Sequence, residues 1–157
     1  MQAATARLSV TTIAFKDGVM AGDTQITSDT LIYRAQKIYK LPDGGLVGGC
    51  GPWSKAYKAI AWMLDGEKGE SPKFEDAMIV IAKPDGSLWM ADDDFPAYPL
   101  LDKYIAVGCG AQAAMLAMND GATAVEAIQK VCKLDSHTSA PVQYLSITKT
   151  HKKKKTK

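Results

Sequence analysis

The sequence has few of the residues that build disulfide or metal frameworks. Its 157 residues include three cysteines and two histidines. Cys50, Cys109 and Cys132 are odd in number and have no paired spacing, which argues against a disulfide framework and for a reducing compartment. Without a ligand-like cysteine pair, His137 and His151 do not indicate a structural zinc site. We therefore expect a cytoplasmic protein with no structural metal.

Long apolar runs and phosphate-binding loops are also missing from the sequence. No apolar run reaches the length that spans a membrane. The first ten residues, MQAATARLSV, lack the apolar core of a secretory signal. The glycines between Gly44 and Gly51 do not have the GxxxxGK[ST] or GxGxxG spacing of nucleotide-binding loops. The sequence therefore predicts no membrane association and no phosphate-binding loop of these two kinds.

Positive charge is concentrated at the C-terminal end. The chain has 19 lysines and arginines against 17 acidic residues, a formal net charge of +2. Six of the lysines lie in the last nine residues, KTHKKKKTK, so residues 1–148 carry a net charge of −4. Lysine runs of this kind are usually solvated. We expect residues 149–157 to be a disordered tail and nucleic-acid binding to be absent.

Length and composition predict one globular domain. Of the 157 residues, 46% are hydrophobic and 23% are charged, so the chain is long enough to bury its own core. Strand-like runs alternate along it with helical periodicity. The predicted strands are Thr11–Phe15, Val19–Ala21, Leu31–Tyr33, Lys37–Leu41, Leu46–Cys50, a hairpin within residues 76–94, Lys103–Val107 and Val142–Ile147. The predicted helices begin at Trp53 and cover Ala111–Met118 and Ala122–Cys132.

Most links between the predicted strands are hairpin turns, which favours antiparallel sheets. Apolar runs such as MIVIA (residues 78–82) are typical of strands that are covered on both faces. Helices that are separated in the sequence could then cover two outer faces. The pattern predicts an α+β protein with a four-layer αββα sandwich, although periodicity alone also allows a two-layer α+β fold.

Two threonines, Thr11 and Thr12, stand at the head of the first predicted strand. Threonine favours strands, which is one explanation. A chemical explanation is also available, because a threonine at the start of a chain carries a hydroxyl nucleophile and a basic α-amine on the same residue. Ten residues precede Thr11 here. The chemical explanation therefore requires that they be removed.

Six segments in order resemble one known family. They are TTIAF, AGDTQIT, RAQKIYKL, GGLVGGCG, AVGCGAQAAMLAM and DSHTSAPVQYLSI. From Thr11 to Ile147 the chain resembles the N-terminal-nucleophile hydrolases of the proteasome β-subunit class, above all the bacterial HslV peptidase and its short phage-type relatives. The resemblance implies a leader or propeptide at residues 1–10, a peptidase domain at residues 11–148 and a tail at residues 149–157.

This resemblance assigns the catalytic groups. Thr11 Oγ would be the nucleophile, and the Thr11 α-amine, which titrates near about pH 8, would be its base. Lys37 would stabilise the alkoxide, and Asp23 would hold Lys37 charged and oriented. Taken one at a time, Lys37 would be interpreted as a surface lysine and Asp23 as a turn residue.

The remaining site residues follow from the same resemblance. The backbone N–H of Gly51 would stabilise the oxyanion, and Asp135 with Thr138 would position the amine. Cys109 lies at a catalytic position where the family usually has serine, and a thiol is a weaker hydrogen-bond donor. Without the resemblance, the glycines fit a tight strand end, and Asp135 with Thr138 fits a helix end. The predicted substrate-binding residues are Thr27, Gly48, Gly49 and Trp53.

The implied function is that of a threonine endopeptidase subunit in a self-compartmentalising, ATP-dependent protease. Subunits of this type form hexameric rings that stack in pairs and receive unfolded polypeptides from an AAA+ unfoldase of the HslU type. Hydrolysis by this mechanism needs no metal or organic cofactor. Two other functions stay open: a catalytically silent shell or scaffold that retains its leader, and a small-molecule amidase.

The fate of residues 1–10 distinguishes the peptidase from the silent shell. HslV-type chains normally expose their threonine by loss of the initiator methionine alone. Three explanations fit the ten residues before Thr11: self-cleavage of the Val10–Thr11 bond, translation that begins at Val10, or an inactive protein that never matures.

Overall fold

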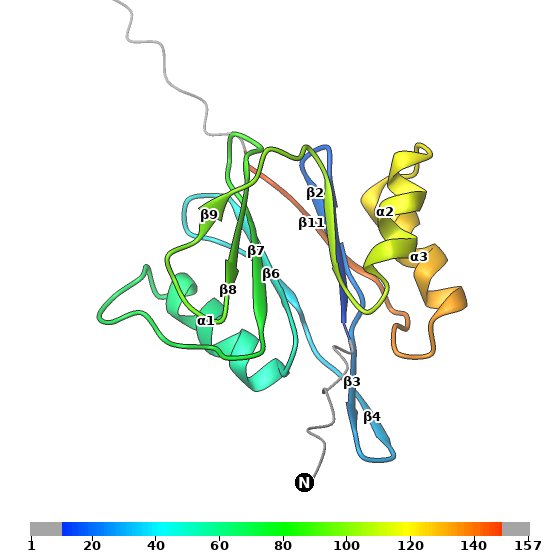
Figure 1. Ribbon diagram of the computed structural model, residues 1–157, viewed down its shortest axis with the longest axis horizontal. Coiled ribbons are helices and arrows are strands. Elements are labelled where there is room, and N and C mark those ends of the chain that lie inside the picture. Colours follow the sequence, from blue (N-terminus) through cyan, green and yellow to red (C-terminus); the bar gives the residue numbers. More distant parts are fainter. Residues whose placement is uncertain (1–10, 149–157) are drawn as a thin grey trace, which may run out of the picture.

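Two antiparallel β-sheets pack face to face in the computed structural model, which describes residues 11–148 (Figure 1). The first sheet has four strands in the order β10-β1-β2-β11. Adjacent pairs are antiparallel, with Ile13 opposite both Val107 and Gly22. The strands are β1 (Thr12–Lys16), β2 (Val19–Gly22), β10 (Ile105–Gly108) and β11 (Gln143–Ser146).

The second sheet has five strands in the order β5-β6-β7-β8-β9. Its central strand β7 is the MIVIA segment, and four of its five residues are buried. The strands are β5 (Ile38–Lys40), β6 (Leu46–Cys50), β7 (Met78–Ala82), β8 (Leu88–Asp92) and β9 (Tyr98–Pro99). Sequence patterning finds the long members but misses β9, because two residues that include a proline give no alternation.

Apolar side chains fill the space between the two sheets. The first sheet contributes Ile13, Phe15 and Met20, and the second contributes Leu46 and Val80 among others. Because successive side chains of a strand point to opposite faces, each strand that meets this core also presents residues to the outer layer.

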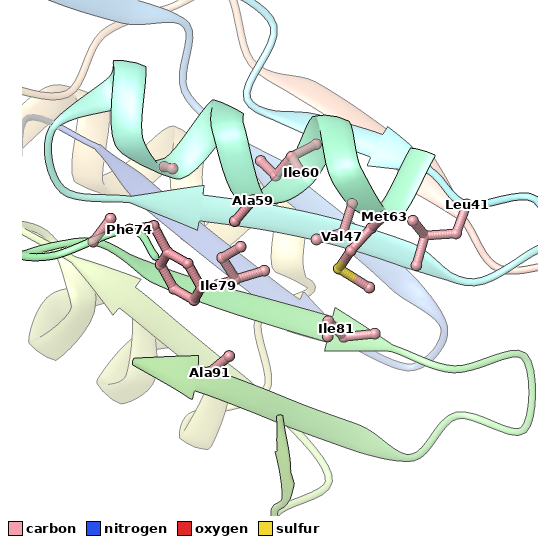
Figure 2. Close-up of a cluster of buried hydrophobic side chains, with 11 residues drawn as sticks. Leu41, Val47, Ala59, Ile60, Met63, Phe74, Ile79, Ile81 and Ala91 are labelled. Atoms are coloured by element: carbon pink, nitrogen blue, oxygen red, sulfur yellow. The ribbon is translucent and has the colours of Figure 1, made fainter. Parts of the chain in front are cut away.

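Helix α1 (Trp53–Leu64) covers the outer face of the five-stranded sheet. Figure 2 shows Ile60 and Met63 of α1 above Val47 and Ile79 of the sheet. The helix has its buried residues at positions 56, 59, 60 and 63, which is the spacing of one helical face. The same helical spacing of apolar residues is what made the helix at Trp53 predictable from the sequence.

Helices α2 (Ala111–Asn119) and α3 (Ala124–Leu134) cover the outer face of the four-stranded sheet. Small side chains of the sheet, including Ala14 and Ala21, let them approach closely. At the start of α3, the Thr123 and Glu126 side chains form a reciprocal capping box. The layers are therefore helix, sheet, sheet and helices, which confirms the αββα prediction and excludes the two-layer alternative.

A two-stranded hairpin extends from the sandwich (Figure 1). It consists of β3 (Gln25–Ser28) and β4 (Leu31–Arg34). Only β4 was expected, because the QITS sequence of β3 lacks a clear apolar alternation. The predicted leader and tail lie outside the described residues. Within residues 11–148, no helix is both long and apolar enough to cross a membrane.

Candidate active site

Thr11 lies directly before β1 and is held by the turn that follows β10. Its carbonyl oxygen accepts a hydrogen bond from the Cys109 N–H at 2.9 Å. Gly108 has a φ of +103°, and a Cβ at that position would lie 1.7 Å from the Thr11 carbonyl oxygen. A glycine is therefore required where the two chain segments meet, and this contact fixes the position of the Thr11 backbone.

Asp23 and Lys37 form a buried ion pair beneath the start of β1. The Lys37 Nζ lies 3.2 Å from both carboxylate oxygens and also donates to the Gln25 carbonyl. Asp23 Oδ1 accepts from the Thr12 N–H at 3.0 Å, and Oδ2 accepts from the Gln25 N–H at 3.1 Å. Both side chains are almost completely excluded from solvent. The sequence prediction that Asp23 orients Lys37 thus corresponds to a contact in the structure.

Burial determines the electrostatics of this pair. It lowers the pKa of the Lys37 ammonium, and the Asp23 carboxylate opposes that shift. Burial likewise raises the pKa of Asp23, against the opposing effects of Lys37 and of the N–H groups of Thr12 and Gln25. Each partner thus opposes the effect of burial on the other, so loss of one would leave a buried group without its compensating charge.

A chain of hydroxyl groups connects the start of β1 to the segment after α3. Thr12 Oγ1 accepts from the Gly110 N–H at 3.0 Å and lies 2.9 Å from Thr138 Oγ1. Thr138 in turn donates to Asp135 Oδ2 at 3.3 Å. Since a hydroxyl has one proton to donate, Thr138 accepts from Thr12. The chain therefore runs from Gly110 through Thr12 and Thr138 to the Asp135 carboxylate.

Asp135 is suited to end this chain as an anion. Its partial burial opposes ionisation, but hydrogen bonds from the His137 N–H, Cys109 and Thr138 outweigh it and hold the pKa of Asp135 below its usual range. The structure brings Asp135 and Thr138 to the hydroxyl of Thr12, one residue beyond Thr11. Their predicted role toward the Thr11 amine stays a prediction. Thr12 itself was not a predicted site residue, since its β-propensity already explains it.

Cys109 lies beside the same group of hydroxyls. Its Sγ is 3.3 Å from Thr138 Oγ1 and 3.6 Å from both Thr12 Oγ1 and the Thr11 carbonyl oxygen. Burial raises the pKa of the thiol, and its contacts with the two threonine hydroxyls only partly oppose this rise. The group is therefore a neutral thiol at pH 7 and a weak hydrogen-bonding partner for its neighbours.

Thr11 opens onto a cavity of about 540 Å³ between the β3–β4 hairpin and the start of α1. Four predicted site residues line it: Thr11, Thr27, Gly51 and Trp53. His137 also lines it, and its place in DSHTSAPVQYLSI is the one sequence feature that pointed to this residue. The full lining is Thr11, Gln25, Ile26, Thr27, Ser28, Asp29, Gly51, Pro52, Trp53, Ser54 and His137.

The three predicted glycines have different surroundings. Gly51 has a φ of +100°, and a Cβ there would lie 2.4 Å from the Asp76 carbonyl oxygen. Gly48 faces Ile13 in the core between the sheets, and Gly49 faces Ala56 of α1, with 3.1 Å from an added Cβ in each case. Neither Gly48 nor Gly49 lines the cavity. Both pack closely against the neighbouring layers, and their predicted contact with substrate stays a prediction.

Metal ligands do not gather at this site. Among residues 11–148, no group of three or more histidine, cysteine or acidic side chains could hold a metal ion. The side chains gathered around the site are hydroxyls, an ammonium–carboxylate pair, an imidazole and a thiol.

The architecture is the fold of proteasome-like N-terminal-nucleophile hydrolases. Two solved structures of Thiobacillus denitrificans BPH are similar: a complex with epoxomicin (TM-score 0.63, 16% identity) and a second structure (TM-score 0.60, 17% identity). Each match covers 88% of this chain and 98% of BPH. Eukaryotic HslV from Trypanosoma brucei is also similar (TM-score 0.59, 16% identity), with 86% of this chain and 99% of HslV covered.

These similarities show a shared fold. No protein-family model matches the sequence, and no curated protein matches it. The resemblance inferred from short motifs is thus confirmed at the level of the fold, at a sequence identity of 16–17%.

Proposed function

We propose that this protein is a threonine peptidase whose nucleophile is Thr11, exposed as the first residue of a mature chain. The observation that carries the proposal is that Thr11 lies beside both a cavity and the buried Asp23–Lys37 pair. Thr11 and Gly51 line the same cavity, and Asp23 connects the Thr11–Thr12 backbone to the buried Lys37 ammonium. A nucleophile, a cation and a backbone donor at a glycine with positive φ are the parts that acyl transfer requires.

In the mature chain, the free amine of Thr11 takes the proton from its own hydroxyl. The Lys37 ammonium stabilises the negative charge that grows on Oγ, and Asp23 keeps that ammonium in place. Oγ attacks the substrate carbonyl, and the Gly51 N–H donates to the oxyanion. The resulting ester is hydrolysed by water, with the same amine as base.

The proposed assembly is a homo-oligomeric ring or double ring that encloses the active sites in the cytoplasm. Unfolded polypeptide is the proposed substrate, and an AAA+ unfoldase of the HslU type is the proposed partner. Support comes from the similarity to HslV and from a physical consideration: a broadly specific peptidase is safe in a cell only when its sites are enclosed. Residues 11–148 form the proposed peptidase domain.

Loss of the hydroxyl tests the proposal. In a chain that begins Met-Thr11, from which the initiator methionine is removed, Thr11→Ala should abolish hydrolysis of a fluorogenic peptide. Thr11→Ser should retain part of it, because the attacking group is still present. Epoxomicin, which is bound in one BPH structure, should inhibit the parent chain. Full activity of the alanine variant would refute Thr11 as nucleophile.

A silent shell is the second candidate function, and one observation favours it. Thr11 follows Val10 in the sequence, so its nitrogen is an amide until that bond is broken. In addition, Thr138, which was predicted to position the Thr11 amine, contacts the hydroxyl of Thr12, and so does Cys109. A chain that keeps residues 1–10 would retain the fold and would have no α-amine base.

A further inference from the structure

Thr12 is completely buried, and none of the catalytic roles above uses its side chain. Its hydroxyl is held on two sides, because Oγ1 accepts from the Gly110 N–H at 3.0 Å and lies 2.9 Å from Thr138 Oγ1. Thr138 donates its own proton to the Asp135 carboxylate, so the Thr12 proton points to Thr138. A buried hydroxyl that both donates and accepts in this way has one fixed orientation.

The backbone of Thr12 is bonded to Asp23 in both directions. The Thr12 N–H donates to Asp23 Oδ1 at 3.0 Å, and the Thr12 carbonyl oxygen accepts from the Asp23 N–H at 3.3 Å. The same carboxylate oxygen lies 3.2 Å from Lys37 Nζ. Thr12 thus contacts the buried ion pair through its backbone and the chain of hydroxyls through its side chain.

The contact between the Thr12 hydroxyl and Gly110 needs the space that a glycine leaves. An added Cβ at Gly110 would lie 2.7 Å from Thr12 Oγ1 and 2.2 Å from Val131 Cγ1. Gly110 immediately precedes helix α2, where N–H groups have no partner within the helix. One explanation of the hydroxyl is therefore local, since it supplies an acceptor at the start of α2. A second explanation is that it also holds the neighbouring Thr11.

We propose that Thr12 is a positioning residue, whose buried hydroxyl fixes the Thr11 nucleophile for attack. This inference rests on the proposed function, in which Thr11 is the nucleophile. Both polar atoms of the peptide group between Thr11 and Thr12 are bound: its carbonyl oxygen by the Cys109 N–H at 2.9 Å and its N–H by Asp23. Because this group is planar, the Thr11 hydroxyl can move only by rotation about the bonds of Thr11 itself.

Loss of the Thr12 hydroxyl would reach Thr11 through the turn that precedes α2. Cys109 and Gly110 are consecutive, and their N–H groups bind the Thr11 carbonyl oxygen and Thr12 Oγ1. When Gly110 has no acceptor, the turn can move and take the Cys109 N–H with it. The Thr11 hydroxyl then loses its fixed position at the cavity. A displacement of about 1 Å in an active site can lower a rate by about 100-fold.

The kinetic test uses the mature chain of the proposed function, made by removal of methionine from Met-Thr11, and a fluorogenic peptide. Thr12→Val keeps the shape of the side chain and removes the hydroxyl. We expect kcat to fall by about 10–100-fold and KM to change by less than about threefold, because the nucleophile is misplaced while the cavity is intact. Thr12→Ser keeps the hydroxyl and should retain kcat within about threefold of the parent. A kcat of Thr12→Val at the parental level would overturn the inference.

Thr24 is the matched control, because it is a second buried threonine with a bonded hydroxyl. Its side chain donates to the Pro141 carbonyl oxygen at 2.8 Å, away from the contacts of Thr12. Thr24→Val should lower the melting temperature about as much as Thr12→Val and should leave kcat within about twofold of the parent. An equal loss of kcat in both variants would show a general effect of stability and would overturn the positioning role.

A double-mutant cycle tests whether the hydroxyls of Thr12 and Thr138 act as one unit. Thr138→Val alone should lower kcat, because it removes the link to Asp135. Combined with Thr12→Val, it should lower kcat no further than the more severe single change. Groups that act independently would multiply their losses, and that result would overturn the connection.

Amide hydrogen exchange in the full-length chain tests positioning without any peptidase activity. In Thr12→Val, the Gly110 amide loses its acceptor and should exchange faster. The amides of residue 12 and Cys109 should also exchange at least about tenfold faster, whereas Thr24→Val should leave them unchanged. If Thr12→Val does not fold, Thr138→Val provides the same measurement, because it removes the acceptor of the Thr12 proton.

The pattern of exchange distinguishes this inference from the proposed function. A change confined to the Gly110 amide would mean that the hydroxyl only completes the start of α2, and the inference would be overturned. If the mature parent chain is inactive toward peptides while the three amides respond together, the proposed function fails and the positioning of this segment by Thr12 stands.

Discussion

Asp23 and Lys37 lie 3.2 Å apart in a position closed to solvent, and the same Asp23 oxygen that meets the ammonium accepts the Thr12 N–H. One carboxylate thus connects a buried cation to the backbone next to Thr11. The ammonium can move little, because it also donates to the Gln25 carbonyl. A fixed charge at this position costs no reorganisation when a negative charge develops nearby.

Replacement of Lys37 should affect both stability and rate. Lys37→Ala leaves Asp23 buried without its partner, so we expect about 3–5 kcal/mol lower free energy of unfolding and a loss of several orders of magnitude in peptide hydrolysis. Lys37→Arg should not restore activity, because the planar guanidinium does not fit the place of an ammonium. Denaturant unfolding and a fluorogenic peptide assay measure the two effects.

Lys55 offers a matched control for that experiment. It pairs with Asp76 at 3.8 Å, but both side chains are largely exposed. Exposed pairs contribute about 0–1 kcal/mol, so Lys55→Ala should leave stability and activity nearly unchanged. Parental activity in Lys37→Arg would mean that the ammonium has no catalytic part, whatever the stability of the variant.

Local patterns and long-range contacts were not equally predictable from the sequence. Strand β6 was placed at Leu46–Cys50 because its apolar run ends at a turn on one side and a helix on the other. The contact of Thr12 with Thr138 joins residues 126 positions apart, and no local pattern specifies it. Strong β-propensity masked the hydroxyl role of Thr12. The close packing of Gly48 and Gly49 against the neighbouring layers is likewise a long-range feature that no local pattern specifies.

A side chain at Gly51 should disturb the active-site cavity. In Gly51→Ala, the new Cβ would lie 2.4 Å from the Asp76 carbonyl oxygen, and the residue would keep a left-handed φ of +100°. The segment must therefore move, which displaces the N–H proposed to bind the oxyanion. We expect a loss of at least about 100-fold in kcat, on the scale of a removed oxyanion donor.

Gly66→Ala is the control for backbone strain. Gly66 has a φ of +79°, and an added Cβ would meet no atom within 4 Å. Both variants carry the strain of positive φ, but only Gly51→Ala combines it with a clash at the cavity. Equal activity in the two variants would show that the geometry at Gly51 is unimportant for catalysis.

Alkylation of Cys109 should be slow at neutral pH even though the residue is exposed. Burial of its sulfur raises the pKa, and only the thiolate reacts. The thiol therefore stays protonated to higher pH than a solvated one. We expect the rate with iodoacetamide to keep rising above about pH 9, where a solvated thiol with a pKa of about 8.5 approaches its plateau.

Peptide mapping assigns the alkylated site, and Cys109→Ser identifies the signal. Cys50 is buried and should react only on unfolding. A plateau below pH 9 for Cys109 would mean that its neighbours stabilise the thiolate. In that case the thiol would be a stronger participant in the site than its hydrogen bonds indicate.

Comparison of two chains tests the role of the Thr11 amine. In a full-length chain that is prevented from processing, the Thr11 nitrogen is an amide and is not basic. Such a chain should be nearly inactive toward peptides even with Lys37 and Gly51 in place. A chain that begins Met-Thr11 should be active without a processing step, since removal of methionine frees the amine.

The measurement requires equal assembly of both chains, determined by light scattering, with a fluorogenic peptide and unfolded casein as substrates. Intact mass must show that the leader is still attached in the long chain throughout the assay. If the short chain assembles but stays inactive with and without a candidate unfoldase, the silent shell is the better description. If the long chain is equally active with its leader attached, the amine is not the base. Thr11 and Thr12 would then serve only as strand-forming residues at the head of β1.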